Sequence, residues 1–164
     1  MESKMTSRIP WHEKMERPKE PRIVQIKSRW RRWQQQYGSG TMLIATPRLV
    51  EGLMRRAHKG KLLTIGQIRE RLAKDFGATT TCPLTTGIFA RIVAEAANEE
   101  MNEGKKRVTP FWRLVRDDGG LMEKFPGGVH GQAKLLRTEG CTVVPGKGKK
   151  APRVKDFEKR LGKL

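Results

Sequence analysis

The sequence has little cysteine or histidine. Its two cysteines, Cys82 and Cys141, lie far apart in the chain, and neither belongs to a CxxC pair. This argues against a disulfide scaffold and against a structural zinc site. The three histidines, His12, His58 and His130, show no metal-ligand spacing. We therefore predict neither a metal nor a cofactor.

Long apolar runs are also missing. No run approaches the roughly 18 residues that span a bilayer, and the first twenty residues, MESKMTSRIPWHEKMERPKE, contain no apolar core of a secretory signal. We expect a soluble intracellular protein that makes no membrane contact, located in the cytoplasm and associated with the nucleoid. At 164 residues, the chain is long enough for one domain with a single core, and we expect a monomer.

Acidic residues are scarce relative to basic ones. The chain has 35 Lys and Arg against 17 Asp and Glu, a net charge of +18. Such an excess attracts polyanions such as nucleic acid. Residues 1–40 hold ten Lys or Arg against four acids, and residues 145–164 hold eight against two. We therefore interpret residues 1–40 as a basic arm, 41–144 as the packed domain and 145–164 as a basic tail.

Within the arm, the stretch KSRWRRWQQQYGSG mixes cations with aromatic rings. Its cations suit phosphates and its rings suit stacking on bases. The predicted contacts are Lys27, Arg29, Arg31 and Arg32, beside Trp30, Trp33 and Tyr37. The same stretch has apolar residues at helical spacing from Ile23 to Tyr37, which instead indicates an amphipathic helix packed on the core. Both interpretations remain open at this point.

The tail PGKGKKAPRVKDFEKRLGKL has a Gly- and Lys-rich start that is typical of disorder, with helix expected near Phe157. Its charge density favours phosphate contacts by Lys147, Lys149 and Lys150. The alternative is a solvated tail without a partner.

The middle of the chain is punctuated by helix caps. Thr46-Pro47 supplies an N-cap and a first-turn proline, and Thr64 has capping-box spacing to Gln67 in a helix that Gly77 ends. A third helix is expected from about 84 to 101, followed by a strand in RVTPFWRLV, a DDGG turn and a last helix. This order predicts a mainly α, winged helix-turn-helix domain.

Two segments, GKLLTIGQIRERLA and PFWRLVRDDGGLMEKFPGGVHGQAKLLRTEG, resemble the C-terminal domain of O6-alkylguanine-DNA alkyltransferases. In that family a Pro-Cys-His-Arg motif with a reactive cysteine precedes a short strand, a Gly-containing turn, a Tyr/Phe-x-Gly-Gly loop and a Leu-Leu…Glu-Gly helix end. The resemblance covers roughly residues 42–144. It implies a domain that enters the minor groove of double-stranded DNA, flips the damaged base and inserts an arginine into the gap.

The departures from the family decide the chemistry. In the family the cysteine thiolate accepts the alkyl group, and a histidine takes its proton through a water and a glutamate. Here the motif reads Pro110-Phe111-Trp112-Arg113, with Phe111 at the cysteine position and Trp112 at the histidine position, while Glu139 matches the glutamate. Neither ring accepts an alkyl group or moves a proton, so alkyl transfer at this degenerate site is excluded.

The chain is therefore similar to the alkyltransferase-like branch, which lacks the cysteine and binds alkylated guanine without reacting, passing it to other repair proteins. It differs from that branch because the histidine is also replaced. Ile65 stands where the family has the tyrosine that turns a phosphate, and NEGKKRV replaces the usual Asn-Pro before the strand. Two rings in the old site imply a pocket that is either open to a base or filled by Phe111 and Trp112.

The resemblance implies two sets of binding residues. Arg91 is the candidate for the inserted arginine, and small residues beside it suit close approach to a groove, or alternatively packing of helix on helix. Glu95, Glu99 and Glu100 repel phosphates, so only the N-terminal half of this helix is expected to touch DNA. The remaining predicted DNA contacts are Thr64, Gln67, Thr85, Thr86, Gly87, Ala90, Ala94 and Arg113. The predicted lesion pocket comprises Phe111, Trp112, Val115, Phe125, Pro126, Gly127 and Gly128.

Three hypotheses follow from the sequence. The first is a non-enzymatic DNA-binding protein that recognises alkylated or distorted DNA in repair. The second is a general nucleic-acid-binding module without lesion specificity. The third is an enzyme that uses Cys82, since this residue precedes Pro83 at a helix N-terminus, where the helix dipole favours a thiolate. A buried or N-capping cysteine is the alternative at that position.

Overall fold

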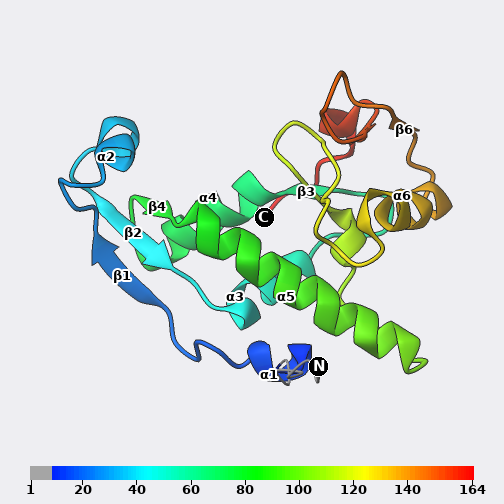
Figure 1. Cartoon of the computed structure of the whole chain (residues 1–164), viewed down its shortest axis with the longest axis horizontal. Helices are drawn as coiled ribbons and strands as arrows, with labels where there is room; N and C mark the ends of the chain where they lie inside the picture. The colour runs from blue at the N-terminus through cyan, green and yellow to red at the C-terminus, as the bar shows by residue number, and fades with distance from the viewer. Residues whose placement is uncertain (1–8) are drawn as a thin grey trace, which may run out of the picture.

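The computed structural model describes residues 9–164, which form a mixed α/β fold built around one long helix, α5 (Pro83–Asn102). A small sheet lies at one end of α5, and the C-terminal elements gather on the other side (Figure 1). Helices hold most of the regular structure, as expected from the sequence, and in the described part seven short strands form three small sheets beside them.

The first sheet is formed by residues on both sides of the expected arm boundary. Strand β1 (Arg22–Gln25) pairs antiparallel with β2 (Thr41–Ile44), and β2 pairs parallel with β4 (Thr80–Thr81). Helix α1 (Trp11–Lys14) packs on α5, and α2 (Arg31–Tyr37) connects β1 to β2. The predicted amphipathic helix from Ile23 to Tyr37 is therefore wrong in its first half, because β-branched Ile23 and Val24 pair with β2 instead.

Caps define the helices of the middle region, as the sequence predicts. Helix α3 (Pro47–Met54) begins after Thr46, whose Oγ1 accepts from the backbone N–H of Leu49 at 3.2 Å. Helix α4 (Ile65–Phe76) begins with a capping box between Thr64 and Gln67, and Gly77 ends it with a φ of 66°. The three predicted caps are thus confirmed.

The main core lies where α3, α4 and α5 pack together, and Phe111 and Phe125 close it. The predicted strand before the DDGG turn is mostly wrong. Residues Phe111–Arg113 form the 3₁₀ turn η1, and only β5 (Leu114–Val115) is extended, where it pairs parallel with β3 (Leu63–Thr64). Pro110 favours the turn, because its ring fixes φ and it cannot donate to a ladder. These short parallel strands do not by themselves define a wing.

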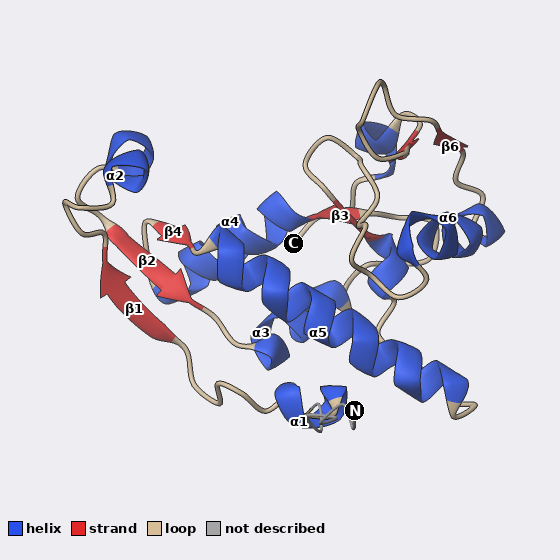
Figure 2. Ribbon diagram, in the orientation of Figure 1, coloured by secondary structure: helices blue, strands red, loops and turns tan. Residues whose placement is uncertain are grey.

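The C-terminal elements fold back on the domain. Helix α6 (Gly128–Thr138) is followed by β6 (Val143–Val144), which pairs antiparallel with β7 (Arg153–Val154), and by the 3₁₀ turn η2 (Phe157–Arg160). Val154 and Phe157 are buried in a second cluster with Leu121 and Leu136. The helical structure expected near Phe157 is present as the 3₁₀ turn η2, and the C-terminal segment folds back beside α6 (Figure 2). The buried side chains of Val154 and Phe157 hold this segment against the core.

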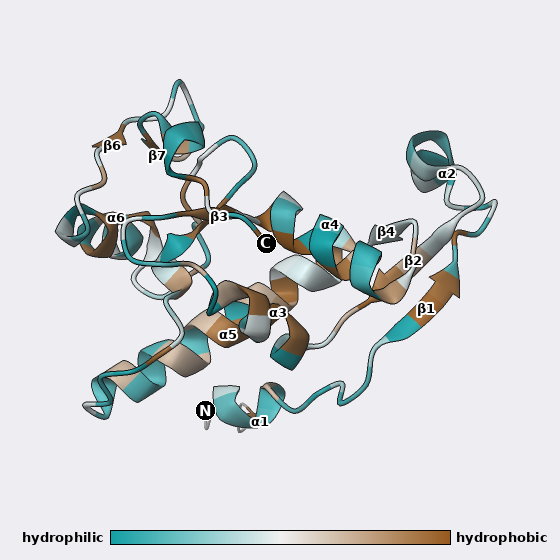
Figure 3. Ribbon diagram, turned by 180° about the vertical axis from the view of Figure 1, so that it is seen from behind, coloured by the Kyte–Doolittle hydropathy of each residue, from teal (hydrophilic) through white to brown (hydrophobic). Residues whose placement is uncertain are grey.

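Hydrophilic residues of α5 gather toward its C-terminal end, whereas apolar residues dominate its packed middle (Figure 3). The hydrophilic C-terminal half of α5 contains Glu95, Glu99 and Glu100. Among residues 9–164, every helix is too short or too polar to span a membrane.

Candidate nucleic-acid interface

The N-terminal end of α5 presents an exposed apolar face. Leu84 and Ile88 are 70% and 49% exposed, one turn apart, and Gly87 between them has open space in front of its Cα. Cys82 precedes the helix, and its carbonyl accepts the Oγ1–H of Thr86 at 2.6 Å. The first two turns of α5 therefore offer a surface of small and apolar groups to a partner.

The small-residue stripe lies on the opposite side of the helix. Ala90 and Ala94 are fully buried, Ala97 is nearly so, and Thr86 is fully buried as well. These side chains belong to the interior where α3 packs on α5. The prediction that Thr86, Ala90 and Ala94 contact DNA is therefore corrected, because their small size serves helix packing.

A pocket of about 470 Å³ opens beside this exposed face. Its walls come from α1, the first three turns of α5 and the loop at 122–125. Apolar side chains form most of the lining, namely Trp11, Leu84, Ile88, Ile92, Met122 and Phe125. Charged side chains complete it, namely Lys14, Arg91, Arg116, Glu123 and Lys124. An apolar hollow with cations among its walls suits a flat, partly polar group attached to a phosphate chain.

Arg91 is held at this pocket by Trp11. The guanidinium carbon Cζ of Arg91 lies 5.6 Å from the centre of the Trp11 ring, and its Nε lies 3.9 Å from Oε1 of Glu95. Lys14 Nζ lies 4.2 Å from the same ring. The Arg91 side chain remains 45% exposed, so it is oriented by the ring and by Glu95 and is still available to a ligand.

The predicted lesion pocket is brought together only in part. Phe125 lines the open pocket, but Phe111 is 1% exposed and packs edge-on against Phe125, with ring centroids 6.1 Å apart. Val115 is fully buried in the second core cluster. Trp112 lines a different surface pocket, together with His58 and Lys106. The prediction of one pocket from these residues is corrected, because Phe111 and Val115 are core residues.

The remaining predicted lesion-pocket residues form the turn into α6. Pro126 precedes Gly127, which has a φ of 76° and caps the helix, and Gly128 is its first residue. A Cβ on Gly127 would meet the Cα of Gly131 at 3.1 Å. These residues shape the turn beside Phe125 and do not themselves line the open pocket.

The degenerate site holds a network centred on Glu139. Trp112 Nε1 donates to Oε1 at 3.1 Å, Arg113 donates from its terminal NH2 to Oε1 at 2.6 Å, and the backbone N–H of Gly60 donates to Oε2 at 3.2 Å. Arg113 also donates to the carbonyl of Ala57 at 2.6 Å. The side chains of Arg113 and Glu139 are 14% and 7% exposed. The predicted DNA contact by Arg113 is therefore corrected, because its guanidinium is committed to this network.

Two opposing influences act on Glu139. Burial, the larger single one, would raise its pKa, but the hydrogen bonds from Arg113, Trp112 and Gly60 together outweigh burial and lower the pKa below the ordinary value. Glu139 is thus held as a carboxylate. In this chain it stabilises a charge pair and orients an indole.

The residues predicted to contact DNA from α4 have structural roles. Thr64 is 7% exposed, and its Oγ1 accepts from the Gln67 N–H at 3.1 Å. Gln67 Oε1 accepts from the Thr64 N–H at 2.9 Å, and its Nε2 donates to the carbonyl of Gly162 at 2.9 Å. The predictions for Thr64 and Gln67 are corrected, because their side chains hold the capping box and the contact with Gly162. Thr85 is half-buried, and its hydroxyl reaches the carbonyl of Cys82 at 3.4 Å.

The basic residues near α2 are exposed, as a phosphate-binding surface requires. Lys27, Arg29, Arg31 and Arg32 all reach solvent. Their aromatic neighbours pack on the protein: Trp33 and Tyr37 stack on each other with centroids 5.8 Å apart and join a small cluster with Ile26, Met42 and Cys82. The rings thus anchor α2, and the cations remain exposed to a polyanion.

Both cysteines are buried. Cys82 is 8% exposed and Cys141 is 4% exposed. Burial, with a smaller contribution from Glu139, raises the pKa of the Cys141 thiol despite the opposing Arg160. In the part of the chain that the structure describes, no group of three His, Cys, Asp or Glu side chains is arranged to hold a metal.

Sequence reasoning missed the residues that make the open pocket. The sequence predictions do not include four residues of its lining, Trp11, Leu84, Ile88 and Met122. A signal existed in Leu84 and Ile88, which are four residues apart and fall outside the small-residue stripe of their helix. No local pattern could place Trp11 beside Arg91, because about eighty residues separate them in the chain.

Comparisons with known proteins add a distant likeness. No protein-family model matches the chain, and no curated protein matches it by sequence. Among solved structures, the chain is similar to S. pombe Atl1, whose crystal structure is in complex with damaged DNA containing O6-carboxymethylguanine. The TM-score is 0.46 and the sequence identity 16%, over 72% of this chain and 94% of that one. A likeness this distant does not define the fold or the function of this chain.

Proposed function

We propose that the protein binds double-stranded DNA without catalysis and recognises an alkylated or distorted base, which it receives in the pocket at the N-terminal end of α5. The observation that carries this proposal is the pocket itself. The ring of Trp11 and the apolar side chain of Phe125 suit a base, and Arg116 and Lys124 suit the phosphates beside it.

In this proposal α4 and α5 act as a helix-turn-helix, with a wing near the loop after β5, and α5 enters the minor groove by its exposed face. Leu84, Gly87 and Ile88 then face the groove, and Arg91 enters the gap left by the extruded base. Extrusion costs a few kcal/mol and costs least for a damaged base, so a protein without a nucleophile can still select lesions.

The resemblance to cysteine-less alkyltransferase-like proteins agrees with this assignment. Phe111 is 1% exposed where that resemblance places the alkyl acceptor, so the base is held in front of Phe125 and not against Phe111. As part of the same proposal, the protein acts as a monomer in the nucleoid and passes the lesion to repair proteins.

The test compares two duplexes that differ only in one central base, guanine or O6-methylguanine. Wild type is expected to bind the modified duplex more tightly. Trp11→Ala is expected to lose about 1–3 kcal/mol of binding to the modified duplex, the usual value of one base–aromatic stack. Trp11→Phe keeps a ring and is expected to retain most of the affinity. Thermal unfolding of both variants separates binding from stability. If the wild-type protein binds both duplexes with equal affinity, the proposal that it recognises the lesion is wrong.

A second candidate, a general nucleic-acid-binding module, is favoured by the net charge of +18. It predicts equal binding to both duplexes together with a steep fall of affinity with salt. The enzyme hypothesis has less support, because Cys82 is only 8% exposed and packs with Ile26 and Met42. Isotopically labelled alkylated DNA tests it, and label on Cys82 would establish it.

A further inference from the structure

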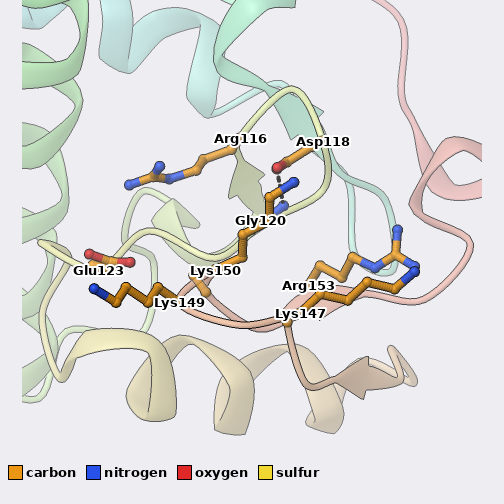
Figure 4. A pocket seen from close by; sticks show the side chains of 10 residues that line it. Arg116, Asp118, Gly120, Glu123, Lys147, Lys149, Lys150 and Arg153 are labelled. Carbon is orange, nitrogen blue, oxygen red and sulfur yellow. Dashed lines mark hydrogen bonds between the residues drawn. The ribbon is translucent and has the colours of Figure 1, made fainter.

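A second hollow, of about 540 Å³, lies between the loop after β5 and the segment that joins β6 to β7. Five cations line it, Arg116, Lys147, Lys149, Lys150 and Arg153, against the two acids Asp118 and Glu123. Figure 4 shows these side chains on both sides of the hollow. The segment at 145–153 lies beyond the part of the chain that resembles the alkyltransferases.

The five cations form no ion pair among the residues that the structure describes. Among residues 9–164, none of them lies within 4.0 Å of a carboxylate oxygen. Asp118 is engaged by its own loop, where its Oδ1 accepts from the Gly120 N–H at 2.8 Å. The hollow therefore concentrates an excess of positive charge, five cations against two carboxylates, and a polyanion placed there relieves the repulsion between the cations.

The cleft is built by the fold and is not a chance gathering of tail lysines. The backbone N–H of Leu121 donates to the carbonyl of Pro152 at 2.8 Å, and that of Val154 donates to the carbonyl of Gly119 at 3.0 Å. Gly146 lets the loop close, because a Cβ there would collide with the backbone oxygens of Lys150 and Ala151. These contacts hold the lysines against the loop after β5.

The cleft continues into the apolar pocket beside α5. Arg116 and Glu123 line both hollows, so the two share a wall. A comparable basic hollow, of about 500 Å³ at Lys61, Lys155 and Lys159, shares no lining residue with either of them. When a base lies in the apolar pocket, the phosphates next to it on the same strand are therefore close to the hollow at Arg116 and Lys147. The hollow at Lys61 does not adjoin that pocket.

We propose that the cleft of Arg116, Lys147, Lys149, Lys150 and Arg153 binds the phosphodiester backbone of the DNA strand that carries the recognised base, next to that base. This inference rests on the proposed function, and it gives the C-terminal segment a specific role as a clamp on one strand. Each phosphate bound there releases counterions, so the cleft contributes to the salt dependence of binding.

The test measures affinity as a function of salt for the modified and unmodified duplexes described above. The cleft variant combines Lys147→Gln, Lys149→Gln and Lys150→Gln. Its matched control combines Lys61→Gln, Lys155→Gln and Lys159→Gln, with the same loss of charge from exposed lysines of the other basic hollow. We expect the cleft variant to lose about two to three units of the slope of log K against log salt, and the control less than about one.

A second pair of variants separates geometry from charge. Gly146→Ala forces the loop open while every cation is kept, and we expect it to lower the salt slope as well. Gly52→Ala is the control, because its added methyl group meets nothing within 4 Å. Both proteins are compared with wild type by thermal unfolding.

The outcomes distinguish the two proposals. Equal slopes for the cleft variant and its control overturn the phosphate cleft, even where wild type prefers the modified duplex. A selective loss of slope on both duplexes, without any wild-type preference for O6-methylguanine, supports the cleft and overturns lesion recognition.

Discussion

The indole N–H of Trp112 donates to Oε1 of Glu139 at 3.1 Å. The same carboxylate binds the guanidinium of Arg113 and the backbone N–H of Gly60, so it ties η1, the end of α6 and the loop after α3 together. The family that the sequence resembles uses this glutamate to relay a proton. Here its neighbours are an indole and a guanidinium, which serve as N–H donors and offer no acceptor.

Removing the charge of Glu139 is expected to destabilise the fold. Glu139→Gln leaves the Arg113 guanidinium, 14% exposed, without its counterion. Loss of one partner of a buried pair costs about 3–5 kcal/mol, and we expect the lower end because both groups retain some solvent contact. Urea denaturation at neutral pH measures the loss. Glu20→Gln, at an exposed carboxylate, is the control, and equal stability of the two variants would contradict the structural role.

The same residue makes stability depend on pH in a defined direction. The pKa of Glu139 is lower in the folded protein than its ordinary value of about 4.5. The stabilisation is therefore complete above that value and is lost as the pH falls through the lower, folded pKa. The difference in unfolding free energy between wild type and Glu139→Gln is expected to narrow below about pH 4.5. If the difference in unfolding free energy between the two proteins stays constant until they unfold in acid, the Glu139 carboxylate is not the source of the pH dependence.

Thr64 is expected to affect stability and not DNA binding. Thr64→Ala removes the acceptor of the Gln67 N–H at the start of α4, and loss of such a cap costs about 1 kcal/mol. Thr64→Ser retains the hydroxyl and is expected to restore most of the stability. Chemical denaturation measures the unfolding free energy of each variant, and titration with duplex DNA measures its affinity. If Thr64→Ala lowers the affinity for DNA and leaves the stability unchanged, Thr64 contacts DNA after all.

The sequence predicted the local features of this fold well. Caps at Thr46 and Thr64 and the helix end at Gly77 depend on neighbours within a few residues, so their patterns are readable. The strand at Arg22–Gln25 was missed because its partner lies about twenty residues away. The helical turn near Phe157 was predicted from the sequence, but strand β7 (Arg153–Val154) was not, because its pairing with β6 and the burial of Val154 depend on residues outside the tail.

The candidate site was harder to predict than the fold. The resemblance drew attention to Phe111 and Trp112, and the structure places Phe111 in the core. For Ala90 and Ala94, the sequence analysis gave two interpretations, approach to a DNA groove or packing against another helix. The buried positions of both residues agree with the second. Spacing along a helix shows which residues share a face, but it does not show whether that face meets solvent or another helix. The pocket depends on Trp11, which only tertiary packing brings to α5.

Restoring the lost side chains is not expected to restore alkyl transfer. The double variant Phe111→Cys and Trp112→His returns the family's residue types, but position 111 is 1% exposed and lies behind Phe125. A sulfur there cannot reach an alkyl group held in the open pocket. Truncating a buried phenylalanine also costs about 3–5 kcal/mol, and Trp112→His removes the indole bound to Glu139. The double variant Phe111→Ala with Trp112→His therefore serves as the control. Incubation with DNA carrying labelled O6-methylguanine, followed by mass spectrometry, is expected to find no methyl group on the introduced cysteine. A methyl group there, absent from Cys82 and Cys141, would show that the base reaches Phe111 and would move the recognition pocket to the degenerate site.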